Sequence, residues 1–169
     1  MRFYCLQLLR GDFLIDTIKI QGLWRFTWQD YDEKGNTVNF RQSEWGKNTI
    51  TGAGKVFLAQ LIIGRVTNNI AWYMAAGTGT TPATNSDTKL QTEGFRKIVT
   101  NKLLSAAIMR IRTYLLASDA IGNWSEFGIF LGGTAVANSG TLLSRLLPQG
   151  GISKASNQVL TVETNITVA

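Results

Sequence analysis

Few residues of this chain could carry out chemistry, because its 169 residues include no histidine and a single cysteine, Cys5. Without histidine, the usual general base, the usual zinc ligand and the common serine triad are excluded. One cysteine can form neither an intramolecular disulfide nor a metal-binding cluster. Catalysis by carboxylates or lysine stays open, and the one candidate acid is Glu126 in the sequence WSEFG.

Glu126 can be interpreted as a catalytic acid or as a structural residue. It is expected to share one face of a strand with Trp124 and Gly128, and apolar neighbours raise the pKa of a carboxyl group, as glycosidase acids require. Nothing in the sequence specifies the second carboxylate of such an enzyme. The favoured interpretation is that Glu126 is buried against an arginine such as Arg96 or Arg145 and ties strands together. We therefore expect a protein that is not an enzyme and holds no metal.

Two glycine-containing segments invite comparison with nucleotide-binding loops, and both fail it. A P-loop ending in Gly54-Lys55 would need glycine where Thr49 stands, and serine or threonine where Val56 stands. The segment GTG at residues 77–79 lacks the third glycine and the following helix of a dinucleotide site. No cofactor is expected.

The stretch that organises the chain is residues 72–96, WYMAAGTGTTPATNSDTKLQTEGFR. Its apolar start predicts a buried strand, and the glycines and proline of GTGTTP predict the turn that ends this strand. Leu90 is the expected apolar anchor, and Asp87 is expected to cap the turn leading to it. The residues assigned to this structural loop and its ion pair are Gly77, Gly79, Pro82, Asp87, Glu93 and Arg96. Glu93 and Arg96 are close enough to pair if this piece is helical. The alternative is a binding tip, since functional residues often lie on loops held by rigid scaffolds.

Alternation of apolar and polar residues predicts strands over most of the remaining chain. Trp24, Phe26 and Trp28 alternate with polar residues, and they are interpreted as core rather than as a sugar-binding platform. The sequence KGN at residues 34–36 predicts a hairpin turn. Further strands are expected at residues 109–115, 124–131, 142–147 and 159–168.

One helix is expected near residues 52–63, where Thr51 can cap its start, an apolar stripe follows, and Gly64 can end it. One helix among many short strands and Gly, Asn and Thr turns predicts an all-β fold. The expected architecture is a β-sandwich of about eight or nine strands, with a jelly-roll-like arrangement as one variant.

The chain divides into an amino-terminal arm at residues 1–12 and a single β-sandwich domain at residues 13–169. The arm carries the apolar side chains assigned to assembly, which are Phe3, Tyr4, Leu6, Leu8 and Leu9. These side chains need burial, which a neighbouring subunit could supply. No run reaches the roughly 18 apolar residues of a membrane-spanning helix, so membrane insertion is not expected. Because Arg10 and Asp12 interrupt the apolar start, no signal peptide is expected, which fits assembly in a cytoplasm.

The net charge of +6 is uneven, because residues 51–169 carry ten Lys and Arg against five Asp and Glu. The cations that could contact phosphates are Arg96, Lys97, Lys102, Arg110 and Arg112. No aromatic–basic RNA motif or recognition helix accompanies them, so nucleic acid is not an expected partner. The excess is interpreted as a solvated basic surface.

Several of these motifs, in order, resemble a family of small structural proteins of tailed bacteriophages. The motifs are WRFTWQDYDEKGNTVNF at residues 24–40, NTITGAG at 48–54, the organising stretch, GNWSEFGIF at 122–130, and residues 140–168 with LLSR and SKASNQVLTV. The similarity covers roughly residues 20–168.

The resemblance implies a virion component of a tail, baseplate, neck or surface appendage, located in the virion and docked to neighbouring virion proteins. Such appendages are commonly cyclic, so a homo-oligomer is expected, with a trimer as the first expectation. The alternative is a carbohydrate- or receptor-binding module that contacts a host surface glycan. Binding modules and structural modules share β-sandwich folds, so the fold alone does not separate the two.

Overall fold

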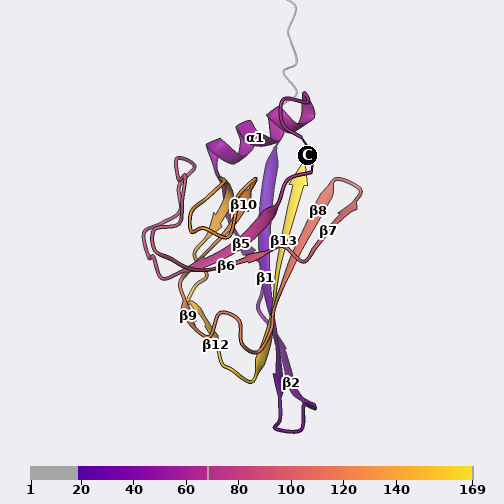
Figure 1. Cartoon of the computed structure of the whole chain (residues 1–169), viewed down its shortest axis with the longest axis vertical. Helices are drawn as coiled ribbons and strands as arrows, with labels where there is room; N and C mark the ends of the chain where they lie inside the picture. The colour runs from indigo at the N-terminus through magenta and orange to yellow at the C-terminus, as the bar shows by residue number, and fades with distance from the viewer. Residues whose placement is uncertain (1–18, 68, 169) are drawn as a thin grey trace, which may run out of the picture.

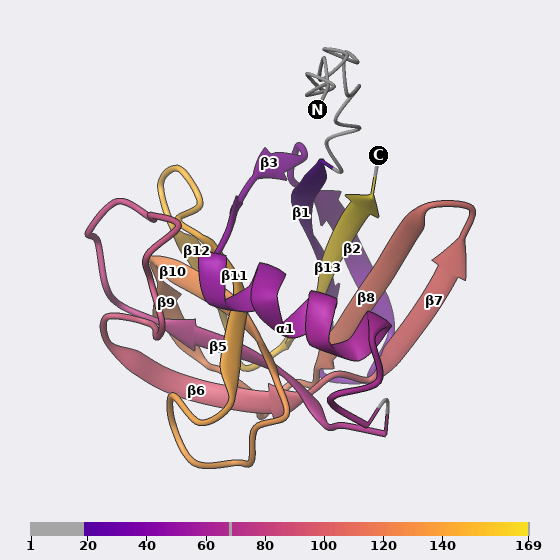
Figure 2. The same cartoon turned by 90° about the horizontal axis from the view of Figure 1, so that it is seen from above.

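The computed structural model of this chain describes residues 19–67 and 69–168. Two antiparallel sheets face each other, and the helix α1 (Gly52–Ile62) lies across the end of the sandwich that is uppermost in Figure 1. Figure 2 looks down from that end, and there α1 spans the space between the sheets. The fold is therefore the all-β, sandwich-like arrangement with one helix that the sequence predicts.

The larger sheet, called sheet A, contains the first and the last strand of the described chain. Its members are β1 (Ile20–Tyr31), β2 (Thr37–Gln42), β3 (Gly46–Lys47), β7 (Asn101–Ser105), β8 (Ile108–Leu115) and β13 (Gln158–Val168). The strand order is β2-β1-β13-β8-β7, with β3 paired to β1. The predicted hairpin turn between β1 and β2 is confirmed, because Gly35 has a φ of +80° and Asp32 Oδ1 accepts hydrogen bonds from the backbone N–H groups of Lys34 and Asn36.

The second large sheet, called sheet B, holds the organising stretch. Its strands are β4 (Thr49–Ile50), β5 (Trp72–Gly77), β6 (Glu93–Ile98), β10 (Glu126–Leu131) and β11 (Thr141–Leu146), in the order β4-β11-β10-β5-β6. A small separate sheet pairs β9 (Gly122–Trp124) with β12 (Ile152–Lys154). Every residue of β10 is buried, because both faces of this central strand are covered.

The core between the sheets follows the predicted alternation, in which every second residue of a strand points inward. Trp24, Phe26 and Trp28 all point inward and are between 0% and 9% exposed, which confirms their assignment to the core. Phe26 packs against Phe127 of β10 with ring centroids 4.8 Å apart, so the two sheets meet through aromatic side chains.

The outer face of sheet B carries a second, smaller cluster. Its buried members are Ala75, Leu90, Phe130 and Leu142. Leu90 comes from the loop at residues 78–92, so this loop covers the outer face of a sheet. Leu90, the predicted anchor, is completely buried over β5, β10 and β11, and this burial holds the loop against the sheet.

Helix α1 begins and ends as predicted. The Oγ1 of Thr51 accepts a hydrogen bond of 2.9 Å from the N–H of Gly54, and Gly64, with a φ of +70°, follows the last turn. The apolar stripe is only partly buried, because Phe57 and Leu58 pack on the core whereas Ile62 is 83% exposed. The helix lies across the end of the sandwich, so the core reaches only part of its circumference.

The described chain has thirteen strands, more than the expected eight or nine, because several are two or three residues long. The expected strand at residues 124–131 is also divided. At Ser125 the chain leaves the small sheet and enters sheet B, and the Ser125 N–H donates to the carbonyl of Gly77. Trp124 and Glu126 therefore belong to different sheets and share no strand face.

The assembly arm, and the beginning of the expected domain at residues 13–18, lie outside the described residues. In the part of the chain that is described, no helix is both long enough and apolar enough to cross a membrane.

Candidate functional site

Glu126 is at the centre of the organising loop. Its side chain is fully buried, and its two carboxylate oxygens accept hydrogen bonds from three backbone N–H groups of the loop. These bonds come from Gly79 at 3.1 Å, Gln91 at 3.0 Å and Thr92 at 2.7 Å. Glu126 therefore holds the first and the last turn of the loop to β10, which is a structural function.

The position of the Glu126 carboxylate explains why glycine stands at residues 77 and 79. A Cβ at Gly79 would lie 2.5 Å from both Glu126 Oε1 and the Cβ of Gln91, and a Cβ at Gly77 would lie 2.6 Å from the same oxygen. Real Cβ atoms do not approach other atoms so closely, so both positions require glycine. This segment does not have the arrangement of a phosphate-binding loop, because the backbone N–H of Gly79 already donates to the carboxylate of Glu126.

Arg145 is the cation that neutralises Glu126, which confirms one of the two predicted partners. Its Nε donates to Glu126 Oε2 at 2.9 Å. Its Nη2 lies 2.8 Å from the same oxygen but is not aligned for a second hydrogen bond, so one bond and one close charge contact hold this pair. The Arg145 side chain is 3% exposed, so the pair is shielded from solvent.

Asp87 is the second carboxylate on Arg145, with Oδ2 accepting from Nη1 at 2.9 Å. Burial alone would raise the pKa of Asp87, but hydrogen bonds from Thr84 and Arg145 outweigh burial and lower the pKa below its ordinary value. The expectation that Asp87 caps the turn leading to Leu90 was wrong. Its carboxylate accepts from the N–H and the Oγ1 of Thr84, so it closes the turn that precedes it. Pro82 is exposed near this turn.

Glu93 and Arg96 form the predicted ion pair, although not on a helix. Both belong to strand β6, and their atoms meet at 2.6 Å (Nε to Oε1) and 2.9 Å (Nη2 to Oε2). A register shift opposite Ala76 and Gly77 places these two side chains, three residues apart, on the same face of the strand. Arg96 also donates to the carbonyl of Ser139, so the pair fastens the loop at residues 132–140.

A buried cation that the sequence did not indicate is Lys154 of β12, which is 2% exposed. Its Nζ donates to the carbonyl of Ala117 at 3.1 Å. Burial lowers the pKa of Lys154, and nearby Asp119 offsets part of this effect. Asp119 is itself paired with Lys97, and both of these side chains are partly exposed, so only Lys154 of the three groups is buried.

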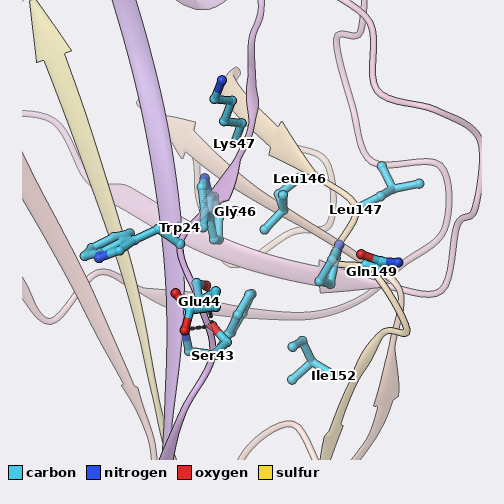
Figure 3. A pocket seen from close by; sticks show the side chains of 12 residues that line it. Trp24, Ser43, Glu44, Gly46, Lys47, Leu146, Leu147, Gln149 and Ile152 are labelled. Atoms are coloured by element: carbon cyan, nitrogen blue, oxygen red, sulfur yellow. Dashed lines mark hydrogen bonds between the residues drawn. The ribbon is translucent and has the colours of Figure 1, made fainter.

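The pocket in Figure 3 opens between β1 and the segment that follows β11. It has a volume of about 370 Å³, and its walls combine Trp24, Leu146 and Ile152 with the polar segment at residues 43–47. Within that segment Ser43 is already used, because its Oγ accepts from the N–H of Phe26 and donates to the carbonyl of Glu44. Trp24 is completely buried, so the aromatic side chain that a sugar ring or a short peptide side chain could contact at this pocket is the half-buried Trp45.

The outer face of sheet A carries the other concentration of charge. In the register of the strands, Glu163 of β13 lies between Arg25 of β1 and Arg112 of β8, and Arg110 is two residues from Arg112. Glu163 is 4% exposed and pairs with all three arginines. The alternation of residues 108–115 places Arg110 and Arg112 on a solvent-facing side, but no sequence signal identifies Glu163 as their shared partner.

Among the described residues, no group of three or more Cys, Asp and Glu side chains is placed to hold a metal ion. The carboxylates of the organising loop are joined to arginines and backbone donors, and none faces a second free carboxylate. Compared with known proteins, the chain matches no family model, no curated protein and no solved structure. Its resemblance to phage structural proteins therefore depends on the sequence motifs alone.

Proposed function

We propose that this protein is a structural component of a tailed bacteriophage virion, which acts by associating with itself and docking onto neighbouring virion proteins. The proposal assigns it no catalysis, no cofactor and no nucleic-acid partner. Its position would be in a tail, baseplate, neck or surface appendage, after assembly in the host cytoplasm. The order of the sequence motifs supports the phage assignment, and the structure contributes the argument for association.

The observation that carries this proposal is the state of the two edges of sheet A. Among the described strands, β2 pairs only with β1, and β7 pairs only with β8. Every residue of both edge strands is exposed, including Val38 and Phe40 on β2 and Leu103 and Leu104 on β7. Exposed edges with apolar side chains are places where another chain adds strands or packs side chains. Such edges fit a protein that works in an assembly.

The experiment has two parts, and the full chain is used in both. Sedimentation velocity should give a concentration-dependent oligomer, with a trimer as the first expectation, and Leu104→Lys should weaken it because a lysine on β7 blunts the edge. Quantitative mass spectrometry of purified particles of the encoding phage should find the chain at a fixed copy number. Absence from particles would overturn the phage assignment, and a monomer at every concentration would overturn self-association.

A second candidate function, a carbohydrate- or receptor-binding module, is favoured by the pocket in Figure 3. Trp45 is half-buried among the residues that line this pocket, which also include the polar Glu44 and Gln149, and its ring is stacked with the Arg25 guanidinium 4.5 Å away. Aromatic rings next to polar groups are typical of sugar sites. Titration of host-surface glycans against tryptophan fluorescence, with Trp45→Ala as the comparison, tests this candidate. A saturable signal that Trp45→Ala abolishes would favour it.

A further inference from the structure

The outer face of sheet A holds more positive charge than its own carboxylate can neutralise. We call Arg25, Arg110, Arg112 and Glu163 the arginine face. Arg112 forms a hydrogen-bonded ion pair with Glu163, but Arg25 Nη2 and Arg110 Nε lie 3.5 and 3.8 Å from its other oxygen, Oε1. These two separations exceed ordinary hydrogen-bond lengths. Three guanidinium groups therefore share one carboxylate.

Unsatisfied polar atoms mark this imbalance. The Nε atoms of Arg25 and Arg110 and the Oε1 of Glu163 are buried and have no hydrogen-bond partner among the described residues. The terminal groups of the arginines remain accessible, since the three side chains are between 28% and 42% exposed. Guanidinium groups bind carboxylates with paired, charge-assisted hydrogen bonds. The arginine face is therefore suited to one or two further carboxylates from outside.

The carboxylates without an ion pair are gathered in one part of the molecule. Within residues 19–67 and 69–168, the acidic residues that form ion pairs are Asp87, Glu93, Asp119, Glu126 and Glu163. The remaining acidic residues of these ranges are Asp30, Asp32, Glu33 and Glu44. Three of them stand at the turn between β1 and β2 beside one cation, Lys34, and we call residues 30–36 the acidic tip. In Figure 1 this hairpin is the lower end of sheet A and projects below the rest of the sandwich.

The tip cannot reach the arginine face of its own chain. Asp30 and Arg25 belong to the same strand, and five residues of extended strand separate them by about 17 Å. The strand is fixed by its pairing with both β2 and β13, so the hairpin does not fold back. A contact between these two oppositely charged surfaces must therefore join different copies of the chain.

We propose that the acidic tip of one copy docks onto the arginine face of a second copy. This inference rests on the proposed function, because it names a pair of surfaces, in addition to the edges of sheet A, through which the chain associates with itself. The formal charges are complementary, with three acids and one lysine on the tip against three arginines and one glutamate on the face. A contact between two different surfaces is head-to-tail, and such contacts close into rings when the rotation allows, as the expected trimer requires.

Charge-reversal variants of the full chain test this docking by sedimentation velocity. Glu33→Lys changes an exposed tip residue that makes no hydrogen bond among those described, so its fold should be unaffected. Arg110→Glu changes the most exposed arginine of the face, and Arg110→Gln replaces it if thermal melting shows that the first variant is unfolded. The matched control for Arg110→Glu is Lys89→Glu, which also replaces a cation by a carboxylate but lies in the exposed loop on sheet B. Each tip or face variant should weaken association at least about tenfold, while the control should not.

Mixing the two association-deficient variants gives the sharpest result. The intact tip of Arg110→Glu can meet the intact face of Glu33→Lys, so the mixture should associate more tightly than either variant alone. Wild-type association should also weaken as NaCl rises from about 50 mM to about 500 mM, because salt screens exposed charges. An oligomer that is unchanged in both variants would overturn this docking and leave self-association through the sheet edges intact. A wild-type monomer at every concentration would overturn both proposals.

Discussion

Replacement of Glu126 by glutamine tests whether this residue holds the organising loop. The substitution keeps size and shape but exchanges one carboxylate oxygen for an NH₂ group. In the wild-type protein, Oε1 accepts from Gly79 and Thr92, and Oε2 accepts from Gln91 and Arg145. In either orientation of the glutamine amide, its NH₂ group, which is a donor, therefore points at two other donors. Whichever way the glutamine is turned, one buried donor and one partly buried donor lose their acceptor.

The expected loss of stability follows from these contacts. A buried donor without an acceptor costs about 1–3 kcal/mol, so two give about 2–6 kcal/mol. Removing one partner of a buried ion pair costs about 3–5 kcal/mol by a separate route, although Asp87 keeps part of the Arg145 charge neutralised. We expect Glu126→Gln to lower the free energy of unfolding by about 3–5 kcal/mol, a large part of the roughly 5–15 kcal/mol of a typical domain.

Urea unfolding followed by tryptophan fluorescence measures this loss. With a denaturant slope near 2 kcal/mol per molar, the midpoint should fall by about 2 M. The control is Glu44→Gln, which makes the same chemical change at an exposed side chain and should leave the midpoint almost unchanged. A loss below about 1 kcal/mol for Glu126→Gln at an unchanged slope would refute the assignment of Glu126 as the anchor of the loop.

Two further predictions concern α1 and the loop. Gly54→Ala should destabilise the protein by about 1–3 kcal/mol, since its Cβ would lie 2.6 Å from the Cα and 2.8 Å from the carbonyl oxygen of Leu143, and thermal melting compares it with Gly46→Ala, which has room for the methyl group. A melting temperature equal to that of the control would contradict the close approach. For Asp87, a folded pKa below the unfolded value stabilises the protein above the unfolded pKa, and this stability is lost as pH falls through the folded pKa. Between about pH 5 and about pH 3, Asp87→Asn should therefore lose less stability than wild type in urea titrations, and parallel curves would count against this linkage.

The regular alternation of side chains made much of the core predictable. The alternation of apolar and polar residues predicts which residues of β1 and β8 point inward. The apolar stripe and one capping residue predict the helix. All of these signals come from residues that are near one another in the sequence. The choice of Glu126 as a structural carboxylate was also predictable, because a buried acid needs a cation. Arg96 and Arg145 were named as examples of the expected arginine partner, and the structure shows that the partner is Arg145.

The remaining features depend on contacts that no local pattern encodes. The register shift in β6 brings Glu93 to Arg96 on a strand, whereas their spacing alone predicted the pair only for a helical segment. The burial of Leu90 on the outer face of sheet B requires knowledge of which side of the sheet the loop crosses. The shared position of Glu163 between arginines of β1 and β8 arises from strand order, since residues 25 and 163 meet only when the sheet is complete.

The pairing of β1 with β13 has a consequence for the order in which the molecule is made. Ile20 pairs with Val168 and Asp30 with Gln158, so the first described strand binds the last one along its length. Contacts between such distant residues are slow to form, because a long chain must be closed before any of them contributes. On the ribosome, β1 can pair with β2 soon after both are synthesised, but its other edge has no partner until β13, the last described strand, emerges. We therefore expect the nascent chain to depend on chaperones, and its native sheet to form late, after synthesis of β13.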